Sequence, residues 1–209
     1  MKISTVVLTQ ILFLLISLTI SVSANERSRP AVGDRATVIG VRFAVGLWAV
    51  DHKMTCPSAR HGNEPKIAIY STALNDNVLD LSVAIDRLIA EDPSLKWSFI
   101  ALSDEKGAYH GVSKGHYSQD EQAQRLKEIK ELAAQREITR LTIGNTSWDK
   151  ARLQESFEMS DDNDVLIQFL GGESKKSREI RYSKLVRSAD LNAERIDSLL
   201  LEIQELRNR

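Results

Sequence analysis

The chain has 209 residues, and its 28 lysines and arginines nearly balance its 29 aspartates and glutamates, for a formal net charge of −1. Neither sign forms long blocks, and no basic stripe with interleaved aromatic residues is present, so nucleic acid is not an expected partner. The single cysteine excludes the disulfide framework that stabilises many exported domains, so the stability must come from packing.

The first 24 residues have the pattern of a secretory signal peptide. Lys2 precedes an apolar run over residues 6–22, and small residues follow, with Ala24 at the expected cleavage point. An uncleaved membrane anchor is the alternative, because the run approaches the roughly 20 residues that span a bilayer, although polar residues dilute it. We expect an exported protein, periplasmic or secreted, that has no membrane attachment after cleavage of residues 1–24.

The remaining chain has the length of one domain, which we place at residues 38–209 after a flexible leader at residues 25–37. Residues 37–50 are rich in β-branched and aromatic side chains, which predicts a strand or a hairpin. Residues 65–72 have a short and nearly continuous apolar centre, which predicts a strand that is buried on both faces.

A helix and a second strand follow. Asn75 or Asp76 can cap a helix whose apolar residues recur every three or four positions, and Pro93 ends it. Residues 96–102 predict the next strand. The order strand, helix, strand implies a parallel pair of strands joined by a right-handed crossover.

The second half continues this alternation. Ser118 and Glu121 form a capping box, which predicts the start of another helix. The remaining predicted elements are strands at residues 138–144, 165–172 and 179–186 and a final helix with an apolar stripe from Leu191 to Leu206.

The resulting order, β-α-β-α-β-β-α after an N-terminal β segment, is the order of the thioredoxin fold. Residues 31–37, "AVGDRAT", are similar to the opening of redoxin-type proteins. Residues 56–71, "CPSARHGNEPKIAIYS", are similar to the stretch that carries a cysteine pair in exported bacterial thioredoxin-like proteins. This resemblance implies an α/β, thioredoxin-like fold with a central four- to five-stranded mixed sheet flanked by helices.

The similarity is degenerate where the family keeps its dithiol chemistry. Cys56 matches the first cysteine of the pair, Ala59 stands at the second, and the loop "STALND" after the first core strand has no cysteine. The cis-proline of the family would fall at Thr139 or Arg140. A dithiol needs one thiolate to attack and a second to resolve the mixed disulfide. We therefore expect loss of dithiol activity and a binding or structural module for a protein partner, with no cofactor.

Two alternatives use Cys56 directly. A single-cysteine thiol peroxidase or glutathione-linked reductase needs one thiolate that a nearby cation activates, and Arg60 and His61 are the candidate activators. A metal site is the other alternative, with His52, Cys56 and His61 as ligands, because imidazole and thiolate suit zinc or copper.

Overall fold

The computed structural model describes residues 29–49, 53–108, 115–171 and 178–207. The expected signal peptide and His52, one of the predicted metal ligands, lie outside these ranges. Within them, no helix has the length and apolar character that crossing a membrane would need.

In the described part of the chain, seven strands form one mixed sheet in the order β2-β1-β5-β4-β3-β6-β7. They are β1 (Val41–Val45), β2 (Met54–Thr55), β3 (Lys66–Ser71), β4 (Phe99–Leu102), β5 (Thr142–Thr146), β6 (Asp164–Leu170) and β7 (Ile180–Arg187). Strands β3, β4 and β5 are parallel to one another, and the other neighbouring pairs are antiparallel. The mixed sheet is confirmed, but four to five strands are too few, because β1 and β2 extend the sheet beyond β5.

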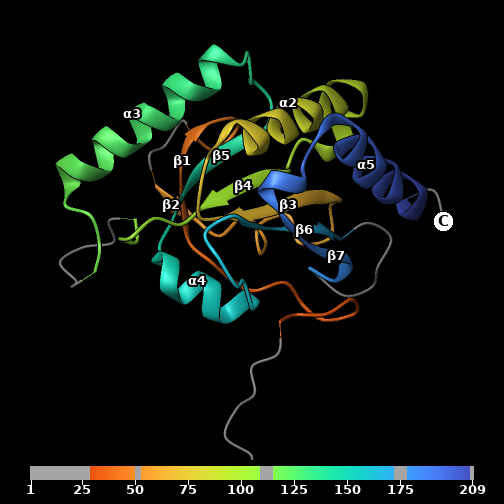
Figure 1. Cartoon of the computed structure of the whole chain (residues 1–209), viewed down its shortest axis with the longest axis horizontal. Coiled ribbons are helices and arrows are strands. Elements are labelled where there is room, and N and C mark those ends of the chain that lie inside the picture. Colours follow the sequence, from red (N-terminus) through yellow and green to blue (C-terminus); the bar gives the residue numbers. More distant parts are fainter. Residues whose placement is uncertain (1–28, 50–52, 109–114, 172–177, 208–209) are drawn as a thin grey trace, which may run out of the picture.

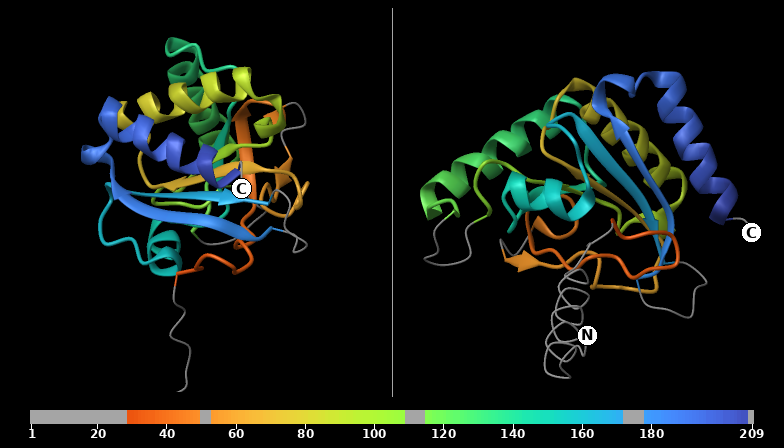
Figure 2. Two further views of the ribbon diagram at one scale, coloured as in Figure 1. Left: turned by 90° about the vertical axis from the view of Figure 1, so that its right-hand side faces the viewer. Right: turned by 60° about the horizontal axis from the view of Figure 1, so that its bottom comes forward.

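Helices cover both faces of the sheet. Figure 1 and Figure 2 show α2, α3 and α5 on one face and α4 on the other. Their bounds are α2 (Asp76–Glu91), α3 (Gln119–Gln135), α4 (Lys150–Phe157) and α5 (Ala193–Arg207), with short 3-10 turns at Pro93–Leu95 and Ser188–Asp190. The predicted caps are confirmed, since Asn75 accepts a hydrogen bond from the backbone N–H of Val78, and Ser118 and Glu121 form the capping box of α3.

The core is divided by the sheet, and the alternation of β3 shows how. Ile67 and Ile69 belong to the cluster under α2, α3 and α5, whereas Ala68 and Tyr70 belong to the cluster on the α4 face. Every residue of β3 is buried. The prediction of a strand buried on both faces is therefore confirmed.

Helix α4 is absent from the sequence-based prediction. Asp149 caps it by accepting a hydrogen bond from the backbone N–H of Arg152 at 2.8 Å, and its buried residues are Leu153 and Phe157. Two buried apolar side chains in eight residues give too short a pattern to reveal a helical period.

The first residues of the predicted third core strand are not strand. A single carboxylate, that of Asp86 on α2, accepts hydrogen bonds from the backbone N–H groups of residues 139–141, so β5 begins only at Thr142. Thr139 and Arg140 therefore lie at the amino ends of the parallel strands, which we call the amino edge.

The strand that pairs antiparallel with β3 is β6, and the residue before it is Asn163. Here the hydroxyl of Thr72, in the loop after β3, donates to the backbone oxygen of Asp162 at 2.7 Å. Asn163 and this loop therefore lie at the same end of the parallel strands, which we call the carboxyl edge, whereas Thr139 and Arg140, where the resemblance placed the cis-proline of the family, lie at the amino edge. Neither location holds a proline.

The end of the expected leader packs on the domain. The backbone N–H of Gly33 donates to the oxygen of Ile180 at 2.8 Å, and that of Ala36 donates to the oxygen of Arg178 at 2.8 Å. Ala36 is only 2% exposed. Ordered packing thus begins before residue 38.

Candidate functional site

Cys56 directly follows β2. Val41 of β1 pairs with both Thr55 and Thr146, and β1 is antiparallel to β2 and to β5, so β2 runs in the same direction as β5. The chain therefore leaves β2 at the carboxyl edge and crosses the sheet to reach the amino end of β3. The thiol of Cys56 is half-buried, and its sulfur lies 3.4 Å from the hydroxyl oxygen of Ser58.

Among the described residues, neither Arg60 nor His61 makes a side-chain contact with this thiol, and their role as activators stays a prediction. The contact between Arg60 and Cys56 is a main-chain hydrogen bond of 3.0 Å, and the side chain of Arg60 is exposed. His61 stacks on Trp97 with 3.8 Å between the ring centroids, and its Nδ1 lies 3.4 Å from a carboxylate oxygen of Glu64.

A buried lysine, which sequence reasoning missed, lies close to Cys56. Lys66 opens β3 and is fully buried, and its ammonium donates to the backbone oxygens of Arg60, at 2.9 Å, and His61. Burial lowers the pKa of Lys66 to about 8, although the charges of Glu64 and Cys56 oppose this shift. Side chains alternate along a strand, so Lys66 shares a face of β3 with Ala68 and Tyr70. This alternation was the sequence signal that could have identified a buried lysine.

The same neighbourhood affects Tyr70. Burial raises the pKa of Tyr70 strongly, and the charge of Cys56 adds to that shift. Lys66 and Tyr70 are therefore two buried titratable groups whose pKa values the charge of Cys56 affects.

The metal alternative is not tested, because His52 lies outside the described residues. Among the described residues, no three side chains of histidine, cysteine, aspartate or glutamate are grouped so that they could hold a metal ion. Cys56 and His61 therefore have no third described ligand.

A second candidate region lies at the carboxyl edge, next to the amino end of α2. It is a cleft of about 290 Å³, which we call the polar cleft. Its lining residues are all polar or charged, namely Thr72, Asp104, Glu105, Tyr117, Arg125, Glu128 and Lys150.

Asp104 and Arg125 form the inner wall of the polar cleft. The guanidinium of Arg125 donates two hydrogen bonds to the two carboxylate oxygens of Asp104, at 2.7 and 2.8 Å. The hydroxyl of Tyr117 donates to the same carboxylate at 3.1 Å. Burial and the charge of Asp104 raise the pKa of Tyr117 to about 12, so Tyr117 remains a hydrogen-bond donor at neutral pH.

Lys150 lies at the outer wall of the polar cleft, between two carboxylates. Its ammonium lies 3.1 Å from the carboxylate of Glu105 and also pairs with Asp162. These hydrogen bonds raise the pKa of Lys150 and lower the pKa of Asp162. Glu105 is 85% exposed, so this outer pair is open to solvent and to any binding partner.

The amino end of α2, where thioredoxins keep their cysteines, is occupied by an asparagine. The side-chain oxygen of Asn75 accepts from the backbone N–H of Val78 at 3.1 Å, and its nitrogen donates to the hydroxyl of Ser188 at 3.0 Å. Both the oxygen and the nitrogen of this side-chain amide therefore stabilise the start of α2. The position has a structural polar group and no sulfur.

The residues of the polar cleft also escaped sequence reasoning. Asp104 comes two positions after β4 and Lys150 four positions after β5. Because the carboxyl ends of parallel strands meet at one edge of a sheet, this placement was the signal that could have found them.

Comparison with known proteins shows the fold and no closer relationship. No protein-family model matches the chain, and no curated protein matches it by sequence. Among solved structures, the chain is similar to a cysteine-to-serine mutant of PrxQ from Xylella fastidiosa, with a TM-score of 0.53, 9% identity and coverage of 85% of this chain and 97% of that one.

Two further structures extend this similarity. One is a protein from Chlorobium tepidum assigned as the thiol:disulfide interchange protein DsbE, with a TM-score of 0.52, 8% identity and coverage of 85% and 98%. The other is a peroxiredoxin-like protein from Aquifex aeolicus, with a TM-score of 0.50, 13% identity and coverage of 85% and 88%. The predicted thioredoxin-like fold is confirmed.

Proposed function

We propose that this protein is an exported thioredoxin-fold binding module that works without dithiol chemistry and recognises a cationic segment of a partner protein at the polar cleft. The observation that carries the proposal is the replacement of thiols at the amino end of α2 by Asn75, beside a cleft built of ion pairs.

The charges of the polar cleft favour a cationic ligand. Four carboxylates, those of Asp104, Glu105, Glu128 and Asp162, surround two cations, Arg125 and Lys150. Glu105 and Asp162 are 85% and 58% exposed, so they can exchange Lys150 for a lysine or arginine of a partner. Complementary charge of this kind contributes to the rate and the specificity of association.

The absence of thiol chemistry is tested with standard substrates. Reduction of insulin disulfides and consumption of hydrogen peroxide are measured with dithiothreitol or glutathione as the electron donor, for the wild type and for Cys56→Ser. We expect no turnover above the rate of the donor alone and no difference between the two proteins. A turnover that depends on Cys56 would overturn the proposal.

The binding site is tested with simple charged peptides. Fluorescence anisotropy compares labelled oligolysine and oligoglutamate of equal length at physiological salt. We expect oligolysine to bind preferentially and the variant Glu105→Gln/Asp162→Asn to bind it roughly three- to tenfold more weakly. The matched control, Glu194→Gln/Asp197→Asn, removes the same two charges from α5. Equal weakening by both variants, or no binding by the wild type, would contradict a site at the polar cleft.

A single-cysteine thiol peroxidase is the second candidate, and the electrostatic interaction between Cys56 and the buried Lys66 favours it. The thiolate would attack one oxygen of a hydroperoxide, forming a sulfenic acid and releasing hydroxide or alkoxide. A first external thiol would then form a mixed disulfide and release water, and a second would regenerate Cys56 and leave as the oxidised disulfide. The buried ammonium would stabilise the attacking thiolate.

The two candidates differ in how they depend on Lys66. If the peroxidase reading holds, Lys66→Met slows the reaction of Cys56 with peroxide at neutral pH, while oligolysine binding does not change. If the binding reading holds, neither Cys56→Ser nor Lys66→Met alters oligolysine binding, and neither protein consumes peroxide.

A further inference from the structure

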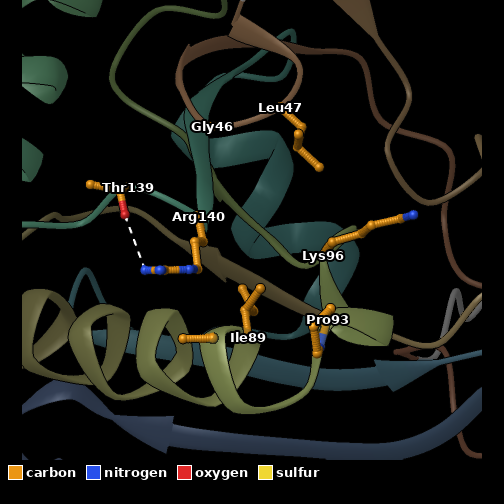
Figure 3. Close-up of a pocket in the computed structure, with 8 residues that line it drawn as sticks. Gly46, Leu47, Ile89, Pro93, Lys96, Thr139 and Arg140 are labelled. Carbon is orange, nitrogen blue, oxygen red and sulfur yellow. Dashed lines mark hydrogen bonds between the residues drawn. The ribbon is translucent and has the colours of Figure 1, made fainter.

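A pocket of about 530 Å³ opens at the amino edge, at the end of the sheet opposite the polar cleft. Figure 3 shows its walls: the turn after β1 with Gly46 and Leu47, the last turn of α2 with Ile89, the following turn with Pro93 and Lys96, and Arg140 before β5. We call it the amino-edge pocket. Neither the proposed binding function nor the peroxidase alternative uses it.

The walls of this pocket are held by the main chain. Gly46 has a φ of +87°, and a Cβ atom there would lie 2.6 Å from the Cα of Thr142, so only glycine allows this turn to press against β5. On the other side, Asp86 fixes residues 139–141 through their backbone N–H groups. The pocket is therefore preformed and does not depend on a ligand for its shape.

The floor of the amino-edge pocket is apolar. Leu47 is 52% exposed although it is a large apolar side chain, and Figure 3 shows it pointing into the same space as Ile89. Ile89 is 3% exposed and forms the bottom, with Pro93 beside it. An apolar side chain left open above a buried one offers surface that a ligand would remove from water.

The rim carries two cations. Lys96 has no ion pair among the described residues, and its ammonium lies 5.2 Å from the centre of the Trp97 ring. The guanidinium of Arg140 donates to the hydroxyl of Thr139 at 3.3 Å, and its nearest carboxylate oxygen, on Asp86, is 3.6 Å away. Because the other oxygen of Asp86 accepts three backbone N–H groups, that carboxylate neutralises Arg140 only in part.

We propose that the amino-edge pocket binds a small amphipathic organic anion. Its apolar body would cover Leu47, Ile89 and Pro93, and its carboxylate or sulfonate would interact with Arg140 or with Lys96, whose side chains extend in opposite directions in Figure 3. The volume lies within the range of about 300–1,000 Å³ that is typical of small-molecule sites. Charge complementarity at the rim selects an anion over a neutral or cationic molecule of the same length.

The test compares three molecules that share one apolar chain and differ in charge: octanoate, octanol and octylammonium. Each is titrated into isotope-labelled full-length protein, and the backbone amide signals are followed by NMR. We expect octanoate to bind most tightly and to shift the signals of residues 46–47, 89–90 and 139–140. Weaker binding of octanol and no saturable binding of octylammonium are expected at the same residues.

Two variants then separate the charge from the cavity. Lys96→Gln/Arg140→Gln should weaken octanoate binding by roughly three- to tenfold and leave octanol binding unchanged, because a partly exposed charge contributes modestly. Its control, Lys127→Gln/Lys130→Gln on α3, should change neither. Ala90→Trp, at an exposed position that lines the pocket, should block both molecules, whereas Ala134→Trp on the exposed side of α3 should block neither.

The outcomes either support or overturn the proposal. Selective loss of octanoate affinity in Lys96→Gln/Arg140→Gln supports it. Equal affinity for the three molecules, or the same affinity before and after removal of the two charges, would mean that the pocket is an unselective apolar surface. Absence of saturable octanoate binding to the wild type would overturn the proposal outright.

Discussion

The two ends of the parallel strands use charged residues in different ways. At the carboxyl edge, charged side chains pair with each other, as Arg125 does with Asp104 and Lys150 with Glu105. At the amino edge, the buried charged side chains bind the main chain. Asp86 accepts from three backbone N–H groups, and Lys66 donates to two backbone oxygens.

This difference indicates what each edge can do. A side chain that pairs with another side chain can exchange its partner for a ligand at little cost, especially where the pair is exposed. A charge that satisfies backbone groups cannot leave without exposing them, so it holds loops in place and builds rigid walls. The polar cleft is therefore suited to exchange partners, and the amino-edge pocket is suited to hold a fixed shape.

The largest expected loss of stability comes from removing Asp86, the carboxylate that accepts three backbone hydrogen bonds. Asp86→Ala leaves three backbone N–H groups without their acceptor, and we expect a loss of about 3 kcal/mol in the free energy of unfolding. It should also abolish octanoate binding, because residues 139–141 are released. Asp80→Ala, a control on the same helix, removes a carboxylate that is 52% exposed, and we expect less than about 1 kcal/mol. Urea denaturation measures both, and similar losses would contradict the contrast.

At the carboxyl edge, the inner pair should matter less. Arg125 is largely buried, and Asp104→Ala removes its bidentate partner as well as the acceptor of Tyr117. We therefore expect a loss of about 2 kcal/mol in the free energy of unfolding. The double variant Asp104→Ala/Arg125→Met should lose less than the sum of the two single variants, because the cation that has lost its bidentate partner is then gone. Strict additivity in the urea transitions would show that the pair does not act as a unit.

Lys66 gives the amino edge a pH dependence with a definite sign. Its folded-state pKa, about 8, is below the ordinary value of 10.5, so between these values the unfolded state retains a proton that the folded state has released. The free energy of unfolding should therefore rise with pH, by about 1 kcal/mol between about pH 7 and about pH 9. The cost of burying the charge is therefore present in full only below about pH 7, and it decreases as the pH rises through the folded-state pKa.

The measurement is the difference between the wild type and Lys66→Met at the two pH values, since other titrating groups then cancel. We expect the gain on raising the pH in the wild type alone. A parallel change in both proteins would assign the pH dependence to another group.

Local patterns in the sequence predicted most of the element order. The capping box at Ser118 and the apolar run of β3 depend on neighbours within one element, and both are found in the structure. The positions of β1 and β2 in the sheet depend on pairing between β1 and β5, about a hundred residues apart in the chain. The late start of β5 depends on Asp86, 55 residues before Leu141. Such contacts leave no periodic signal.

The same distinction between local patterns and long-range contacts applies to the candidate sites. The missing second thiol at Ala59 is visible in the sequence itself. The contact between Arg125 and Asp104 joins residues that are 21 positions apart, and it depends on side-chain rotamers that no sequence pattern specifies. Arg60 and His61 were selected because they are close to Cys56 in sequence. Lys66 is the cation that the fold brings near the thiol, because the loop folds back over the start of β3.

The smallest expected change in stability provides the sharpest test of the contrast between the edges. Leu47 is an apolar residue at the rim of the amino-edge pocket and is 52% exposed, so Leu47→Ser should change the free energy of unfolding by no more than about 0.5 kcal/mol. The same substitution removes apolar surface that octanoate would cover, and we expect its affinity to fall roughly three- to tenfold. Leu201→Ser on α5, where the leucine is 56% exposed, is the matched control and should leave octanoate binding unchanged. If Leu47→Ser instead destabilises the fold by the amount expected of a core leucine, the side chain is packing against its own domain, and the amino edge is a rigid wall without a ligand site.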